Sequence, residues 1–149
     1  MAVLRDDPYG GFCFTVGLGD RDPTAVSAGF TEVSGLERRL TVLRYRAGND
    51  PGLAPRLLPG LAAPVEVRLS RGVIGDLALH QWLEAGLGGA VERRDVVIAL
   101  LSEDRATVAQ RWRLRRAWPV AMLGPTLDAL AGTVAVETLV LAAEALETD

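Results

Sequence analysis

The sequence contains no lysine, one cysteine and one histidine. Because Cys13 is alone, no internal disulfide can form. Because His80 is alone, the common structural zinc sites are excluded, since these take four Cys or His ligands. All 16 basic residues are arginine, which is the side chain best suited to bidentate pairs with carboxylates at protein interfaces. These absences point away from disulfide or metal frameworks and toward packing and ion pairs.

Long apolar segments are also missing. The chain has no run of about 18 apolar residues, the length that a membrane-spanning helix needs. Its first residues, MAVLRDDPYGG, lack the apolar centre of a secretory signal peptide. We therefore expect a protein that assembles in the cytoplasm without a membrane anchor.

The composition suits one domain that covers residues 1–149. Apolar residues make up 49% of the chain, which is enough for a core that needs no metal or disulfide. The formal net charge is −3 and is unevenly spread: residues 91–116 carry seven arginines and four acids, whereas 117–149 carry five acids and no base. An acidic chain with one basic segment argues against general nucleic-acid binding.

Alternation of apolar and polar residues predicts a mostly β, antiparallel domain with six or seven strands. In FCFTVGLGD the apolar side chains, including Phe12 and Phe14, fall on one face. Residues 94–102 are apolar on both faces, so we expect them in the centre of a sheet, with 107–120 returning beside them as a hairpin. Other expected strands cover residues 38–46, 64–70 and 133–146, the last with a frayed or helical end.

A single helix is expected at residues 75–86. Leu79, Trp82 and Leu83 follow the i, i+3, i+4 spacing of a helix face, and Asp76 is suited to begin the helix.

The stretch AGNDPGLAPRLLPG (47–60) has three prolines and three glycines in 14 residues, which predicts a long loop and excludes a helix or a central strand. Loops of this length inside a domain are usually functional. Its leucines, Leu53, Leu57 and Leu58, are unusual for a solvated loop. They indicate that the loop lies against a surface, such as that of another chain.

The stretch QRWRLRRAWPV (110–120) combines arginine with tryptophan, as some nucleic-acid surfaces do. As a strand, it places Arg111, Arg113 and Arg115 on one face and Trp112 and Leu114 on the other. A row of arginines needs acids on a neighbouring strand, an acidic partner or a wet channel. A nucleic-acid-binding β-barrel built on this row is one alternative.

Two further expectations follow from the strand assignments. The carboxylates of Glu66 and Glu137 occupy alternate positions of other strands, so we expect them to pair with the arginine row. The expected core anchors are Phe12, Phe14, Trp82, Trp112 and Leu114.

Motifs for catalysis are weak. His80 would lie on a helix surface with no serine nearby in the sequence, so a nucleophile–histidine–acid site is not indicated. The glycines of GFCFTVGLG lack the strand–GxGxxG–helix context of a dinucleotide site. We expect no enzyme activity, no cofactor and no metal.

Several phrases occur together and in order along almost the whole chain. They are DPYGGFCFTV, AGFTEVSGLE (28–37), YRAGNDP (45–51), RLLPGL (56–61), RGV and DLALHQWL (71–83), RRDVVIALL (93–101), RWRLRRAWPV (111–120), GP followed by LDA, and VAVETLVLA (134–142). This ordered set resembles the tail-tube protein of contractile phages and of phage-like contractile injection systems.

The resemblance implies two packed antiparallel sheets that form a small β-barrel with one flanking helix. It implies homo-hexameric rings that stack into a hollow tube, partners in a contractile sheath, a baseplate and a tube terminator, and DNA or protein cargo in the lumen. Mature subunits would lie in a phage tail or a tail-like particle. Related roles left open are a minor tube-initiating subunit and a type VI-like secreted ring protein.

The resemblance also suggests which residues meet other subunits. Residues expected at subunit or ring contacts are Leu53, Arg56, Leu57, Leu58, Pro59, Glu32, Ser34 and Glu37. Residues expected to face the lumen, another subunit or the sheath are Arg111, Arg113, Arg115, Arg39 and Thr41.

Overall fold

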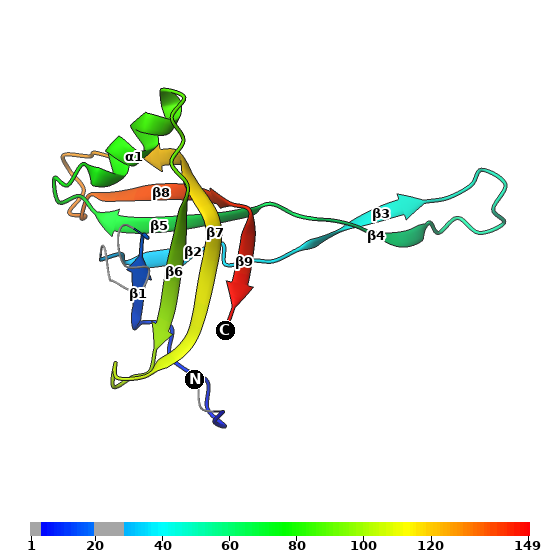
Figure 1. Ribbon diagram of the computed structural model, residues 1–149, viewed down its shortest axis with the longest axis horizontal. Coiled ribbons are helices and arrows are strands. Elements are labelled where there is room, and N and C mark those ends of the chain that lie inside the picture. The colour runs from blue at the N-terminus through cyan, green and yellow to red at the C-terminus, as the bar shows by residue number, and fades with distance from the viewer. Residues whose placement is uncertain (1–3, 20–28) are drawn as a thin grey trace.

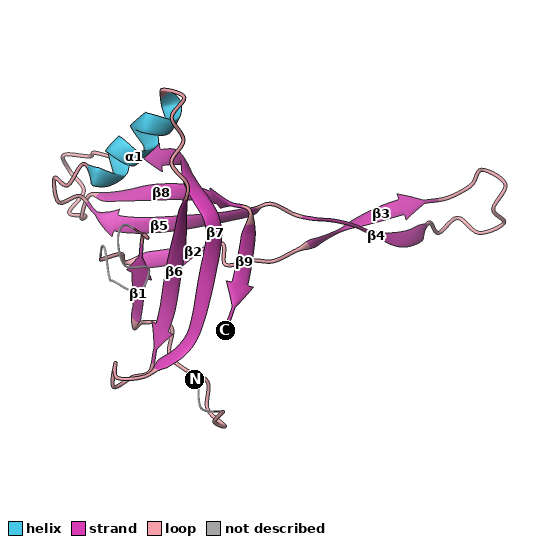
Figure 2. Ribbon diagram, in the orientation of Figure 1, coloured by secondary structure: helices cyan, strands magenta, loops and turns pink. Residues whose placement is uncertain are grey.

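The computed structural model describes residues 4–19 and 29–149, so Ala28, the first residue of AGFTEVSGLE, lies outside the described residues. Over the described ranges the chain forms nine strands and one helix (Figures 1 and 2). They are β1 Phe14–Gly17, β2 Glu32–Ser34, β3 Leu40–Tyr45, β4 Arg56–Ala62, β5 Val65–Gly72, α1 Ala78–Leu87, β6 Arg94–Leu101, β7 Val108–Leu123, β8 Val136–Ala143 and β9 Ala145–Thr148.

Seven strands form a bent antiparallel sheet in the order β1-β6-β7-β8-β5-β2, with β9 beside β7. The 16-residue strand β7 belongs to both halves of this sheet: its first part pairs with β6 and β9, and its last part pairs with β8. At Arg116 the backbone takes a positive φ of 51°, and the Arg116 amide donates a hydrogen bond to the Asp95 carboxylate at 2.9 Å. This bend folds one sheet into the two packed layers that the family resemblance implies (Figure 1).

The core lies between the two layers. Along β5, Val65, Val67 and Leu69 are buried while Glu66 and Arg68 are exposed, as the alternation predicts. Other fully buried side chains come from β1, β6, β7 and β8, namely Val16, Val96, Ile98, Leu114, Leu139 and Leu141. Three further expected anchors are confirmed in part or in full: Trp82 is buried, and Phe14 and Trp112 are partly buried against the core.

The expected core position of Phe12 is wrong. Its side chain is 74% exposed. The reason is that β1 begins two residues later: pairing with β6 starts at Phe14, opposite Leu100. Phe12 therefore precedes the strand, and the alternation that orients Phe14 and Val16 inward does not reach it.

The interpretation of residues 47–60 as one loop is wrong at its C-terminal end. Residues from Arg56 onward form β4, which pairs with β3 in a two-stranded ribbon that projects away from the packed layers (Figure 1). Pro59 is tolerated because each strand of a two-stranded ribbon is an edge strand, and proline occurs on such edges and at bulges. The pairing indeed shifts register between Leu40 and Val42, opposite this part of β4.

The start of helix α1 and the C-terminal segment also differ from the expectation. Helix α1 begins at Ala78, three residues later than predicted, although the Asp76 carboxylate still accepts a hydrogen bond from the Ala78 amide at 3.0 Å. The C-terminal segment has no helical end: after Glu144 it forms β9, which places Leu146 opposite Leu114 on β7. Leu146 is buried, so tertiary packing with β7 explains why strand geometry wins there.

Truncating Leu114 tests the position of the core. We expect Leu114→Ala to lower the free energy of unfolding by about 2–5 kcal/mol, because it leaves a cavity in the packed interior. Phe12→Ala is the matched control and should change it by less than about 0.5 kcal/mol, as for an exposed site. Urea unfolding of the two variants measures both values, and equal losses would contradict the assignment of Phe12 to the surface.

Candidate assembly surfaces

The β3–β4 ribbon carries several exposed apolar side chains. Leu43, Tyr45, Leu57 and Leu58 are 47–66% exposed, and Leu53, near the tip, is 87% exposed. Contiguous exposed apolar surface is typical of contact sites for other molecules.

The expected subunit-contact residues fall into two places. Arg56, Leu57, Leu58 and Pro59 lie on β4 of the ribbon, and Leu53 lies in the loop that joins β3 to β4. The three acidic or polar residues lie outside the ribbon: Glu32 and Ser34 are on β2, opposite Ser70 and Arg68 of β5, and Glu37 follows in the connection to β3. Their role at a subunit contact remains a prediction.

Arg39 and Thr41 lie at the base of the ribbon, away from the arginine row of β7. The Arg39 guanidinium pairs with Glu37 and is exposed. The Thr41 hydroxyl donates to the Leu61 carbonyl at 2.6 Å, across the ribbon. The residues expected to face a lumen, another subunit or the sheath therefore form two separate groups.

The acids that pair with the arginine row are different from those expected. The Arg115 guanidinium contacts Glu147 at 2.8 Å and Asp95 at 3.0 Å. Arg113 lies 3.6 Å from the Asp149 carboxylate. Sequence reasoning overlooked Glu147 and Asp149 because it expected a helical or frayed end where β9 and the C-terminus pair with β7.

Strong ion pairing is reflected in the acid–base properties of this cluster. Hydrogen bonding from Arg115 lowers the pKa of Glu147 below its ordinary value. The pKa of Asp95 is also lowered, first by the hydrogen bond from the Arg116 amide and then by Arg115. The same two carboxylates raise the pKa of Arg115. Arg115 is thus neutralised within its own chain, which leaves less positive charge for an anionic ligand.

Trp112 lies on the opposite face of β7 and lines a small apolar groove between β1 and β2, with a volume of about 270 Å³. It packs against the core and does not share a surface with the arginines. A nucleic-acid groove would need aromatic and basic side chains on one face. The arrangement on β7 disfavours that alternative.

Glu137 and His80 belong to a second ionic cluster. The Glu137 carboxylate accepts hydrogen bonds from Arg71 Nε at 2.8 Å and is 2.9 Å from His80 Nε2. Arg71 and Glu137 are each at most 5% exposed, and Arg71 also donates to the Asp76 carbonyl at 2.9 Å. The expected pairing of Glu137 with the β7 arginines is therefore wrong. The expected pairing of Glu66 with the β7 arginines is also wrong, since the Glu66 carboxylate lies 3.7 Å from Arg68 of its own strand.

Burial by itself would raise the pKa of Glu137, but hydrogen bonds from Arg71 and His80 outweigh it and hold the pKa below its ordinary value. The sequence carries a signal for this cluster. Arg71 is in phase with the buried residues of β5, and Glu137 is in phase with those of β8. An arginine and a glutamate on inward positions of adjacent strands indicate a buried ion pair.

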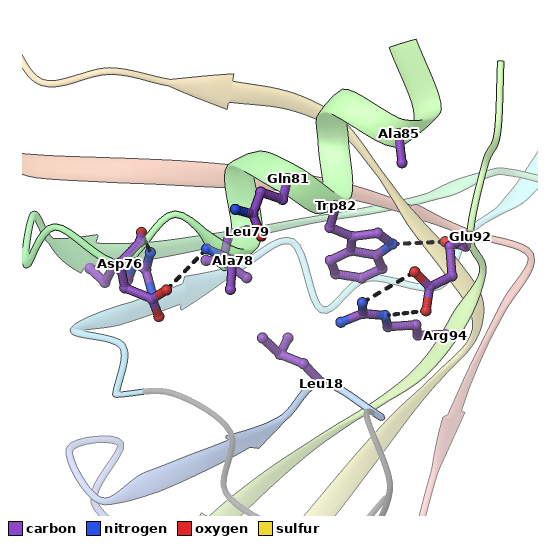
Figure 3. A pocket seen from close by; sticks show the side chains of 10 residues that line it. Leu18, Asp76, Ala78, Leu79, Gln81, Trp82, Ala85, Glu92 and Arg94 are labelled. Carbon is purple, nitrogen blue, oxygen red and sulfur yellow. Dashed lines mark hydrogen bonds and ion pairs between the residues drawn. The ribbon is translucent and has the colours of Figure 1, made fainter. Parts of the chain in front are cut away.

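A pocket of about 410 Å³ lies beside α1 (Figure 3). Its Trp82 indole donates to the Glu92 carbonyl at 2.8 Å, and the Arg94 guanidinium stacks on the Trp82 ring at 4.4 Å while bonding the Glu92 carboxylate. The Asp76 carboxylate accepts from the Ala78 amide at the helix start. These polar groups bond one another and fix the helix to β6; no nucleophile–base pair is formed among them.

Residues 4–19 and 29–149 contain neither a metal-binding cluster nor a helix that could span a membrane. No group of three or more His, Cys, Asp or Glu side chains there is placed to hold a metal ion. No helix in this part of the chain is long and apolar enough to cross a membrane.

Comparison with protein families matches residues 11–147 to the family model of the T4-like virus tail tube protein gp19. The chain belongs to this family. The tail-tube match covers the packed layers, the ribbon and both ionic clusters except Asp149, so the resemblance drawn from the ordered sequence phrases is confirmed. Comparison with the curated proteins gives no significant match.

Solved structures of tail-tube-like chains agree with this assignment. One is from the PVC extracellular contractile injection system, a sheath–tube complex in the extended state: it is 25% identical, with 95% of this chain and 91% of that chain covered and a TM-score of 0.80. A chain of the anti-feeding prophage tube-terminating cap is 27% identical, with 100% and 95% covered and a TM-score of 0.82. A chain of the anti-feeding prophage baseplate is 26% identical, with 97% of each covered and a TM-score of 0.82.

The chain is therefore a structural tail-tube protein, a component of a phage tail or tail-like particle. Its mostly β fold with one helix and two antiparallel layers is the fold expected for such a protein.

Removing the charge of Glu137 tests the buried cluster. We expect Glu137→Gln to lower the free energy of unfolding by about 3–5 kcal/mol, because Arg71 is left buried without its charged partner. Glu84→Gln, on the exposed side of α1, is the matched control and should have little effect. The apolar pair Arg71→Met with Glu137→Leu should recover much of the loss in urea unfolding. If it recovers none, the loss comes from something other than an unpaired charge.

Acid should lower the stability of the fold by protonating the carboxylates of Glu137, Asp95 and Glu147. Their pKa values are lowered in the folded state, so the unfolded chain binds more protons as the pH falls. The stability that these carboxylates contribute is complete above the ordinary carboxyl pKa and is lost as the pH falls through their pKa values in the folded state. Glu103 behaves in the same way, because the hydrogen bond from Arg5 lowers its pKa to about 2. We expect the urea concentration at the unfolding midpoint to decrease once the pH is below about 4.5. This decrease should be less steep in Glu137→Gln. A midpoint that is flat down to pH 3 would contradict this.

Proposed function

We propose that this chain forms the inner tube of a contractile injection device or phage tail. Six copies close into a ring, and the rings stack into a hollow tube. A surrounding sheath contracts and drives the tube through a target envelope, with DNA or protein in its lumen. The observation that carries the proposal is the tail-tube family match over residues 11–147.

The free edges of the bent sheet support ring formation. Among the described strands, β2 pairs only with β5, and the last part of β7 pairs only with β8. Both edges belong to the same layer, at opposite ends of it. An edge strand exposes unpaired backbone groups, and joining the two kinds of edge between copies satisfies them in a closed, head-to-tail ring.

The ribbon supports contacts beyond a simple ring. It extends well outside the packed layers (Figure 1). Its exposed leucines are then covered by other copies in the tube, which removes apolar surface that would otherwise cause aggregation.

In the proposed tube the chain has mechanical tasks and performs no catalysis. In the proposed tube, internal neutralisation of Arg115 by Glu147 and Asp95 limits sticking to anionic cargo. Partners are the sheath, the baseplate and a terminator. In support, related chains come from a sheath–tube complex, a baseplate and a tube-terminating cap.

Electron microscopy of the purified protein tests this function. We expect negative-stain images to show hollow rings with six-fold averages, and tubes at higher protein concentration or with co-expressed baseplate proteins. Sedimentation should give a species of about six subunit masses, as expected for a closed ring. A protein that stays monomeric at high concentration, both alone and with sheath and baseplate proteins, would contradict the proposal.

A further inference from the structure

Phe12 is an exposed aromatic side chain at the edge of the apolar groove between β1 and β2. It is 74% exposed, although its neighbour Gly11 and the nearby Phe14 both line the groove. The groove has a volume of about 270 Å³. An apolar cavity of about 150 Å³ in another protein takes up benzene. The groove beside Phe12 is therefore large enough for one phenyl ring.

The surface of this groove suits an apolar side chain better than it suits water. Most of the side chains that line it are apolar, namely Phe14, Val33, Leu36, Ile98, Leu100 and Trp112. Four of these six, including Trp112, are only partly buried against the core. Protein interiors leave few voids larger than a water molecule, and removing apolar surface from water is favourable. A ring placed in the groove would complete the packing on this side of the core.

The backbone before β1 can direct Phe12 toward the groove. Successive side chains of a strand point to opposite faces, so Phe12 shares a face with Phe14 when the backbone between them is extended. Phe14 pairs with Leu100, and both side chains line the groove. The Cys13 carbonyl accepts a hydrogen bond from the Leu101 amide at 2.8 Å, so strand pairing already reaches Cys13. One further extended residue would bring the Phe12 ring to the groove.

Gly10 permits the exposed position of the ring. A Cβ added at Gly10 would overlap Cε1 of Phe12 and would lie 3.0 Å from its Cδ1. The ring therefore lies directly over the Gly10 backbone, where only glycine leaves room for it. Gly10 and Gly11 also let the chain change direction here, because glycine has wide backbone freedom.

An ion pair holds the segment that precedes these glycines. The Arg5 guanidinium donates to both carboxylate oxygens of Glu103, at 2.7 and 3.0 Å, and stacks on the Tyr9 ring at 3.7 Å. Glu103 lies in the turn between β6 and β7, so the pair fastens residues 5–9 to that turn. Hydrogen bonds from Arg5, and then from the backbone amides of Glu103 and Gly10, lower the pKa of Glu103 to about 2. The carboxylate is therefore charged at ordinary pH and the ion pair stays formed.

We propose that Phe12 is a plug with two positions, one exposed and one in the groove between β1 and β2. In the outward position its ring lies over Gly10, and the ion pair of Arg5 with Glu103 holds the preceding segment in place. In the inward position the backbone before β1 is extended and the ring fills the groove beside Trp112. Loss of the ion pair shifts the population from outward to inward. The plug thus couples the N-terminal segment to the core within one subunit, whether or not that subunit forms a tube.

Gly10→Ala tests the plug because it removes the outward position. The urea midpoint is compared for wild type, Gly10→Ala, Phe12→Ala and the double variant. In the wild-type background Phe12→Ala removes an exposed ring and should hardly move the midpoint. In the Gly10→Ala background the same truncation empties the groove, so it should lower the midpoint by an at least about threefold larger shift.

The direction of this shift separates the plug from a simple displacement. A ring that Gly10→Ala only pushes into solvent gains nothing from the groove. Phe12→Ala would then leave the midpoint of Gly10→Ala unchanged or raise it, and either result overturns the proposal. Gly124→Ala is the matched control, because a Cβ added there meets nothing within 4 Å. In that background Phe12→Ala should have the same small effect as in wild type.

Fluorine NMR locates the ring and tests the ion pair. The purified full-length chain carries para-fluorophenylalanine at position 12, and a soluble gadolinium chelate broadens the fluorine signal according to its exposure. We expect strong broadening in wild type, and broadening at least about threefold weaker in Gly10→Ala and in Glu103→Gln, because the averaged population moves inward. Glu84→Gln, which removes an exposed carboxylate on α1, is the control and should behave as wild type.

Contacts of the labelled ring complete the test. In Gly10→Ala and Glu103→Gln we expect a nuclear Overhauser effect between the ring and the Trp112 indole within one chain. A fluorine signal in Glu103→Gln that is as exposed as in wild type overturns the proposal, since the ion pair then does not hold the ring outward. Samples that mix labelled and unlabelled chains identify the owner of the groove. A contact with Trp112 found only between chains also overturns the proposal, because the ring then fills the groove of a second copy.

Discussion

The fold depends on one long strand that serves two layers. Strand β7 can pair with β6 and β9 at one end and with β8 at the other only because its backbone bends at Arg116. A positive φ at a residue with a side chain is unfavourable, and the hydrogen bond from the Arg116 amide to Asp95 helps to hold it. Leu114, two residues before the bend, is fully buried, so the bend and the core support each other.

Two clusters of charged side chains in the body of the subunit are paired within the chain. Arg71 and Glu137 pair in the interior, with His80 at their outer side, and Arg115 is held by two carboxylates on the neighbouring strands. In a protein without lysine, the planar guanidinium makes such multiple pairing possible, because it offers several donors in fixed directions. His80, the only histidine, takes part in this internal network through its contact with Glu137.

The ribbon differs from the body because many of its side chains are exposed in the single subunit. Its leucines and its excess of arginine are exposed on an element that projects from the packed layers (Figure 2). The body packs around its own core, and in the proposed tube other copies bury the apolar surface that the ribbon carries.

The sequence alone determined the strands whose faces differ in polarity. The alternation in β5 is local and strong, and the central position of β6 follows from its apolar faces. The ordered phrases of the sequence also identified the tail-tube family, and the leucines of residues 47–60 indicated a contact with another surface. Tertiary structure decided the rest. Phe12 is exposed because pairing starts at Phe14, Glu137 meets Arg71 because β8 lies beside β5, and the last residues form β9 because β7 offers them an edge. Such outcomes depend on which strands become neighbours, and contacts between residues distant in sequence are not encoded in any local pattern.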